Sequence, residues 1–172
     1  MPMTDLPAAD LAALRAAADT LPLPTLHARL AWTAAVDIAP RENLGVSALG
    51  ERFIVPILGG AFWGGPGFEA LRGRVRAGGA DRQLLRADGV KELRAEYEME
   101  TDDGAVLTID NRVIVDESVQ PERYALSHLF VTAPAGPHAW LNRRVFVGTL
   151  QSLRPQRQAV VVRGWLLELA AR

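Results

Sequence analysis

The sequence contains no cysteine, a single lysine and no long apolar run. Without cysteine the chain has no disulfide framework, no thiolate nucleophile and no cysteine ligand for zinc or an iron–sulfur cluster. No stretch approaches the roughly 18 apolar residues of a membrane span, and the N-terminus lacks the basic and unbroken apolar regions of a secretory signal. We therefore expect a cytoplasmic protein that does not associate with a membrane.

The charge is almost balanced, since 19 basic and 20 acidic side chains give a formal net charge of −1. Such a balance lacks the excess of basic residues with which proteins bind nucleic-acid phosphates or acidic lipids. The 172 residues, 49% of them hydrophobic, suffice for one globular domain with its own core. We expect no nucleic-acid partner, and a small molecule is the predicted ligand or substrate.

Motifs of cofactor, metal and hydrolytic sites are also missing. The pairs Gly59-Gly60 and Gly78-Gly79 form no GxGxxG or phosphate-loop pattern, and they are typical of strand bulges. The three histidines have no metal-ligand spacing, and no GxSxG elbow surrounds a serine. Lys91, the one lysine, follows a turn signal and is expected to lie in solvent, which disfavours a Schiff-base mechanism. We predict neither a cofactor nor a metal.

Residues 1–24 have the pattern of a short helix. Asp10 can cap it, and prolines at positions 22 and 24 end it. Its apolar stripe consists of Leu11, Leu14, Ala18 and Leu21. We predict a helical extension, residues 1–24, that packs on a main domain, residues 25–172. The alternative is a dimerisation arm, so a homodimer is a further expectation.

Short alternating runs between turn signals fill the rest of the chain. In residues 92–100 every second position points the same way, with Leu93, Ala95, Tyr97 and Met99 on that face. Asp103-Gly104 supplies a tight hairpin turn, and the return strand places Asn111 on the face of Leu107 and Ile109. Later strands are predicted at Tyr124–Thr132, residues 140–148 and Ala159–Leu169. The frequent turns, without helices of βαβ length, predict an all-β fold, mainly an antiparallel β-barrel.

Polar and aromatic side chains in this pattern are candidates for a site. Asp81 follows a glycine pair and can point into a barrel mouth, where burial would raise its pKa and suit it to acid–base work. The alternative for Asp81 is a hydrogen-bonded corner residue. Asn111 and Asn142 alternate with apolar side chains, so each is expected inside, bound to other side chains or to a ligand. Trp140 and Trp63 are either walls of an aromatic-binding pocket or parts of the core.

Ordered motifs over residues 26–148 resemble a known family. They lie at residues 50–52, 56–60, 71–75, 78–84, 97–105 and 139–148. This pattern is similar to that of the domain-of-unknown-function 3237 family, also known as uncharacterised protein family 0311. The resemblance implies an antiparallel β-barrel and a site formed by Arg52, Asp81, Gln83, Asn111, Asn142 and Trp140, with Tyr97 in a matching motif. At the level of fold, such barrels are similar to calycins and allene oxide cyclases.

Three functions are compatible with these residues. The leading hypothesis is an enzyme of isomerase, cyclase or lyase type that acts on a hydrophobic or aromatic oxygenated metabolite without a cofactor. Arg52 would then orient a carboxylate, carbonyl or phenolate, and Asp81 would move a proton. An amide side chain, from Asn111, Asn142 or Gln83, would hold an oxygen. The second hypothesis is a barrel that binds a small molecule without converting it. The third is a solidly packed structural or oligomerising barrel.

Overall fold

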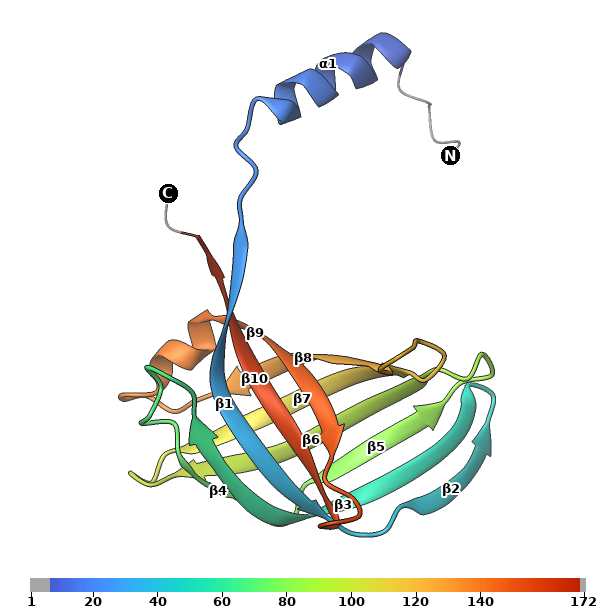
Figure 1. Ribbon diagram of the computed structural model, residues 1–172, viewed down its shortest axis with the longest axis vertical. Helices are drawn as coiled ribbons and strands as arrows, with labels where there is room; N and C mark the ends of the chain where they lie inside the picture. Colours follow the sequence, from blue (N-terminus) through green and yellow to red (C-terminus); the bar gives the residue numbers. More distant parts are fainter. Residues whose placement is uncertain (1–6, 171–172) are drawn as a thin grey trace. The chain divides into compact units, whose positions relative to one another are not determined.

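The computed structural model describes residues 7–170 of the chain (Figure 1). Within that range it contains one α-helix, α1 (Ala8–Asp19), and one 3-10 helix, η1 (Ala139–Arg143). The strands are β1 (Leu26–Ile38), β2 (Glu42–Ser47), β3 (Gly50–Gly64), β4 (Gly73–Val75), β5 (Ala80–Leu85), β6 (Lys91–Thr101), β7 (Val106–Asp116), β8 (Tyr124–Thr132), β9 (Val145–Ser152) and β10 (Ala159–Leu169). The contacts divide the chain into two units, residues 28–168 and the residues on either side of them.

Helix α1 has Pro7 at its N-cap position. The Pro7 carbonyl accepts hydrogen bonds from the amides of Asp10 and Leu11 at 2.9 and 3.1 Å. The prediction that Asp10 caps the helix is therefore wrong, because Asp10 lies within the first turn, where its charge complements the helix dipole. No residue of α1 is buried. Within residues 7–170, no helix is long and apolar enough to cross a bilayer.

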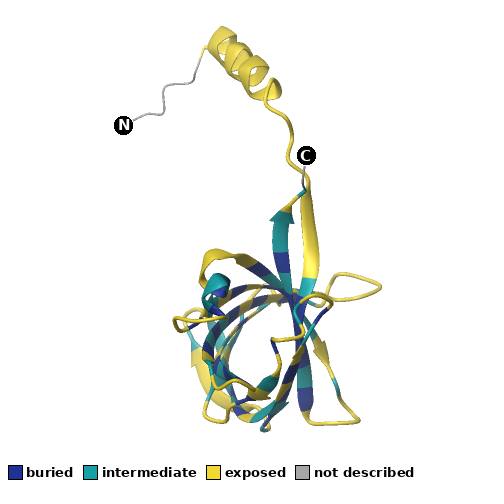
Figure 2. Ribbon diagram, turned by 90° about the vertical axis from the view of Figure 1, so that its left-hand side faces the viewer, coloured by how far each residue is buried: buried dark blue, intermediate teal, exposed yellow. Residues whose placement is uncertain are grey.

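Residues 28–168 form a closed antiparallel β-barrel, which Figure 2 shows as a ring of strands. The hydrogen-bonded order is β1-β10-β9-β8-β7-β6-β4-β3, and pairing of β1 with β3 closes the ring. Strand β5 pairs with the same two neighbours as β4, so the two short strands share one place in a barrel of eight. Strand β2 forms a hairpin with β3. The predicted barrel is confirmed.

The hairpin of β6 and β7 shows why alternation predicted the fold well. Leu93, Tyr97 and Met99 are buried, whereas the side chains between them are exposed or half-buried. The predicted turn joins the two strands, with Gly104 at a φ of +86°. Strands β8 and β10 have the predicted bounds. The predicted strand at residues 140–148 is wrong in its first half, which is the 3-10 helix η1.

The predicted strand bulge is found at one of the two glycine pairs, Gly59-Gly60, whereas Gly78 lies in the turn between β4 and β5. The register of β1 against β3 shifts next to Gly59 and Gly60, so the inward face of β3 changes phase there. Both residues have φ values near +140°, at +136° and +143°, and a Cβ on Gly60 would lie 2.1 Å from the Ala35 carbonyl oxygen. Gly79 precedes β5, and a Cβ there would lie 2.7 Å from the Cβ of Tyr97. Glycine therefore lets neighbouring strands approach closely at Gly60 and at Gly79.

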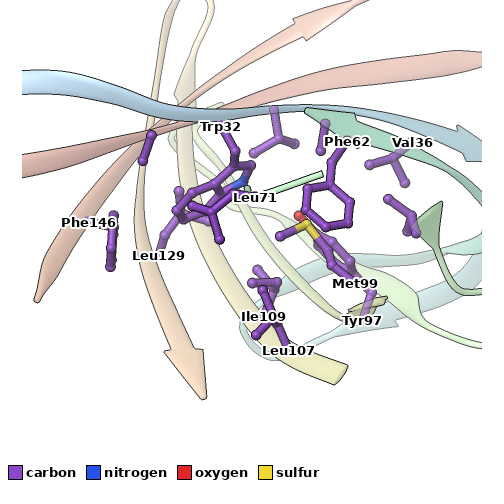
Figure 3. Close-up of a cluster of buried hydrophobic side chains, with 14 of the residues drawn as sticks. Trp32, Val36, Phe62, Leu71, Tyr97, Met99, Leu107, Ile109, Leu129 and Phe146 are labelled. Atoms are coloured by element: carbon purple, nitrogen blue, oxygen red, sulfur yellow. The ribbon is translucent and has the colours of Figure 1, made fainter. Parts of the chain in front are cut away.

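Large side chains fill the end of the barrel interior near the turn between β6 and β7. Figure 3 draws them within a buried cluster that also includes Val36 and Tyr97, which lie further along the barrel. We call this end of the interior the packed end; its members include Trp32, Phe62, Leu71, Met99, Leu107, Ile109, Leu141 and Phe146. The rings of Trp32 and Phe146 have centroids 5.1 Å apart in a tilted arrangement. The buried His138 ring places Nε2 3.0 Å from Oδ2 of Asp103 in the turn. Burial of each large apolar side chain contributes roughly 1.5–3 kcal/mol, so this end supplies much of the stability.

Candidate functional site

The other end of the barrel encloses a cavity of about 450 Å³. It lies between the half of β6 that starts at Lys91 and the half of β7 that ends near Val115, away from the turn between these strands. We call it the hollow end; its aliphatic wall consists of Val36, Ile38, Val55, Ile57, Leu93, Val113, Val115, Leu150, Val160 and Val162. This volume lies within the range of roughly 300–1,000 Å³ that is typical of small-molecule sites.

Asp81 lines this cavity from the start of β5, together with Gln83 two residues further on the same face. The Gln83 side-chain amide donates a hydrogen bond of 2.6 Å to Oδ2 of Asp81. The other carboxyl oxygen, Oδ1, is closed to solvent and has no hydrogen-bond partner among the described residues. Burial raises the pKa of Asp81 to about 6, against the opposing effect of the Gln83 hydrogen bond and the Arg94 backbone amide. One carboxyl oxygen is thus held by Gln83, while the other carries no hydrogen bond within the described residues.

Two further polar side chains line the same cavity, and each has an oxygen atom that forms no hydrogen bond with the described residues. Asn111 is 2% exposed and Tyr97 is 1% exposed, and neither Oδ1 of Asn111 nor the Tyr97 hydroxyl has a hydrogen-bond partner within residues 7–170. Leaving such a group buried and unpaired costs roughly 1–3 kcal/mol. Burial raises the pKa of the Tyr97 hydroxyl above its usual value, so it remains a proton-bearing donor at neutral pH.

The register of three adjacent strands brings these groups around one small residue. Ala95 on β6 pairs with Asp81 on β5 and with Asn111 on β7, so the three residues form one row across the sheet. Strands lie about 4.8 Å apart, which separates the backbones of Asp81 and Asn111 by roughly 10 Å. Tyr97 follows Ala95 by two positions on the same inward face. The methyl side chain of Ala95 leaves room between the polar groups for a ligand.

Basic residues complete the lining at the loop end of the cavity: Arg41, Lys91, Arg123 and Arg154. Sequence reasoning did not select any of them, and Lys91, expected in solvent, has a side chain only 29% exposed. Within residues 7–170, no group of three or more histidine or acidic side chains is arranged to hold a metal ion.

The structure brings together four of the predicted site residues: Asp81, Gln83, Tyr97 and Asn111. It places Arg52 elsewhere. Phe53 and Val55 face inward on β3, and alternation along the strand therefore turns Arg52, which precedes Phe53, outward. There its guanidinium donates a hydrogen bond of 3.0 Å to the Leu44 carbonyl. Arg52 instead lines a second concavity of about 600 Å³, which is formed largely by outward-facing side chains, and it does not line the cavity that contains Asp81. The expectation that Arg52 and Asp81 share one site is therefore wrong.

The remaining predicted contacts also lie away from the cavity lining. Asn142 is exposed in η1, where its side chain bonds to the amide and carbonyl of Ala133 at 2.8 and 2.9 Å, so its predicted interior position is wrong. Trp140 stacks on Phe68 with centroids 5.7 Å apart. Trp63 is 48% exposed because its neighbour on β3, Phe62, faces the core. Neither tryptophan lines the cavity, and Trp140 packs against the core, as the alternative prediction for it stated.

Comparisons with known proteins match this architecture. The family model described as "Protein of unknown function (DUF3237)" matches residues 26–167. A UPF0311 protein of Rhodopseudomonas palustris is 40% identical over 88 residues, which are 51% of this chain and 55% of the relative. The aligned part of the chain thus spans about half the length of that curated relative.

Solved structures extend the likeness over the barrel. That R. palustris protein, described as a conserved protein of unknown function, has a TM-score of 0.75 at 30% identity, covering 85% of this chain and 100% of its own. A β-barrel-like protein from Acinetobacter baumannii has a TM-score of 0.74 at 28% identity, with 86% and 99% covered. An enzyme from Penicillium herquei has a TM-score of 0.64 at 21% identity, with 86% and 98% covered, a likeness of fold alone.

Proposed function

The chain belongs to the DUF3237 family, and from that premise we propose that it is a small-molecule enzyme that uses acid–base chemistry in the hollow end. The proposed reaction is of isomerase, cyclase or lyase type, on a hydrophobic or aromatic oxygenated metabolite. One observation carries the proposal. Asp81, with a pKa of about 6, lines a cavity together with two buried polar side chains that have no partner in the described protein.

Asp81 is the proposed general base. With a pKa of about 6, roughly 90% of the carboxyl groups are ionised at pH 7, and each is a stronger base than an ordinary aspartate. Oδ1 would take a proton from an O–H group, or from a C–H group next to a carbonyl. Returning that proton to another substrate atom completes an isomerisation or cyclisation, and returning it to a leaving hydroxyl releases water.

Tyr97 and Asn111 are the proposed contacts for substrate oxygens. The Tyr97 hydroxyl would donate to a carbonyl oxygen on which negative charge develops, where a donor in a dry site stabilises the transition state. Oδ1 of Asn111 would accept from a substrate hydroxyl. Gln83 does not need to touch the substrate, because its bond to Oδ2 orients the Asp81 carboxylate.

A non-catalytic carrier is the second candidate, and the largely aliphatic wall of the cavity favours it. Such a carrier would use the same apolar wall and polar contacts but would need no proton transfer by Asp81. A solidly packed barrel, in contrast, does not fit a cavity of about 450 Å³. The fold alone does not decide between enzyme and carrier, since one barrel fold can host both.

The test compares wild type, Asp81→Asn and Glu96→Gln on a library of phenols, enols and aromatic ketones in deuterated buffer. Glu96 is exposed on the outer face of β6 beside Ala95, so its variant is the matched control. We expect wild type and Glu96→Gln to convert or deuterate the same compounds, and Asp81→Asn to be slower by about 10²–10⁴-fold. Equal rates for Asp81→Asn and wild type would contradict the proposal. If the proteins bind library compounds but none of them converts or deuterates any compound, the result would favour the carrier.

A further inference from the structure

The two ends of the cavity in the hollow end have different side chains, and the proposed acid–base chemistry does not use this difference. The depth of the cavity holds Asp81, Tyr97 and Asn111 among aliphatic side chains, whereas its loop end holds three arginines and one lysine. These four residues come from different places: Arg41 follows β1, Lys91 starts β6, Arg123 precedes β8 and Arg154 follows β9. The barrel topology therefore gathers four basic side chains along one end of the cavity, although they are far apart in the sequence.

Two of these four basic side chains form ion pairs with a described carboxylate, and two do not. Glu117 accepts a bond of 2.6 Å from Lys91 and lies 3.9 Å from Arg123. Arg41 and Arg154 have no carboxylate within 4.0 Å among residues 7–170. Arg41 instead lies over the Phe53 ring at 4.0 Å from its centroid, which holds the guanidinium in place without neutralising it.

Two acidic side chains on the strands that lead to this end are occupied elsewhere. Asp37 on β1 is bound by Arg157 through two hydrogen bonds of 2.5 and 2.6 Å. Asp116 at the end of β7 accepts from the amide and hydroxyl of Ser118 at 2.9 and 2.6 Å. Arg41 and Arg154 therefore have no ion-pair partner among the described residues at the loop end of the cavity, and guanidinium groups suit planar anions such as carboxylates.

The distance between the basic end and the proposed base limits the shape of the ligand. Lys91 and Ala95 lie on one strand, four positions apart. At about 3.3 Å for each residue, this separates the level of Lys91 from that of Asp81 and Asn111 by roughly 13 Å. Long basic side chains shorten the gap that a ligand must span, so a body of about two fused rings or an eight- to ten-carbon chain fits it.

We infer that the ligand of the hollow end is an elongated amphipathic anion. Its apolar body lies along the aliphatic wall, its acidic group is bound by Arg41, Arg123 and Arg154, and its oxygenated end reaches Asn111 and Tyr97. The inference rests on the proposed function, which places the reacting end of the ligand beside Asp81, but the inference itself concerns binding. It narrows the substrate class to carboxylates or similar anions that carry a second oxygen function at the far end.

Two dyes that share an aromatic skeleton test the charge requirement: 8-anilinonaphthalene-1-sulfonate carries an anionic group, and N-phenyl-1-naphthylamine does not. Fluorescence titrations would compare wild type with Arg41→Gln/Arg123→Gln/Arg154→Gln and with Arg144→Gln. Arg144 is exposed next to η1 and does not line the cavity, so it is the matched control. Ala95→Phe, with its fold verified by circular dichroism, fills the space at the proposed reacting end and shows whether the dyes bind there.

We expect wild type and Arg144→Gln to bind the sulfonate more tightly than the neutral dye. The triple variant should lose roughly tenfold or more in sulfonate affinity with little change for the neutral dye, and higher salt should weaken only the sulfonate complex. Ala95→Phe should weaken both. Equal affinities for the two dyes, an equal loss of both in the triple variant, or no saturable binding to wild type would overturn the inference. Asp81→Asn removes a negative charge from the cavity and should still bind the sulfonate more tightly than the neutral dye, so failure of the charge requirement and failure of the proposed catalysis give different results.

Discussion

The two ends of the barrel are built from the same strands but have opposite interiors. On β6, Met99 is 1% exposed within a group of large side chains, whereas Leu93 and Ala95 border a cavity. On β7, Leu107 belongs to the packed end and Val115 to the hollow end. The backbone ladder is continuous across both, so the difference lies in the side chains alone. A well-packed end supplies stability that allows the other end to keep a cavity and unpaired polar atoms.

The largest expected effect is on stability, and it comes from making the same substitution, leucine to alanine, in each of the two ends. Leu107→Ala, in the packed end, should lower the free energy of unfolding by about 3–5 kcal/mol, because tight neighbours cannot collapse into the space. Leu93→Ala, in the hollow end, should cost only about 1–2 kcal/mol, because that side chain already faces a cavity. Urea unfolding followed by circular dichroism measures both. Equal losses would mean that the two ends are packed alike.

The next effect concerns the charge inside the hollow end. The pKa of Asp81 is raised on folding, so the folded state binds the proton more tightly, and this contribution to stability is present at low pH and lost as pH rises from about 4 through 6. Asp81→Asn removes the titration. Relative to wild type, the variant should therefore gain on the order of 2–3 kcal/mol between pH 4 and pH 8. Urea unfolding at both pH values measures this, and a constant difference would show that Asp81 is solvated.

The smallest effect concerns an unpaired hydroxyl. Tyr97→Phe removes a buried O–H group that has no partner among the described residues while keeping the ring. Since no protein hydrogen bond is lost, the free energy of unfolding should stay the same or rise by up to about 1 kcal/mol. Thermal unfolding of the purified variant measures it. A loss of more than about 1 kcal/mol would mean that the hydroxyl is already bonded in the folded protein.

Much of the fold could be predicted because period-two alternation is strong in β6 and β7. The same alternation placed Asn111 inside, and the glycine pair before Asp81 indicated the corner from which that carboxyl enters the cavity. Arg52 was assigned to the site from motif resemblance, although the alternation of Phe53 and Val55 already turned it outward. The apolar Ile54 between them obscured that signal.

Other features had no readable signal in the sequence. Trp140 and Asn142 fit a strand pattern as well as the short 3-10 helix that they form, because one turn of 3-10 helix is too short to show a period. The basic residues of the hollow end lie far apart in the chain, at positions 41, 91, 123 and 154. Only the strand order brings them to one end, so no local motif could reveal them.

The most direct test of the central claim, that Asp81 is a buried base in the hollow end, is the titration of its carboxyl carbon by ¹³C nuclear magnetic resonance. Comparison with Asp81→Asn assigns the signal, and no ligand is needed. We predict a midpoint at a pH of about 6, which shifts little with salt because the group is shielded from solvent. A midpoint at or below the ordinary value of about 3.8 would contradict the account, because the carboxylate would then be solvated or paired and could not serve as the proposed base.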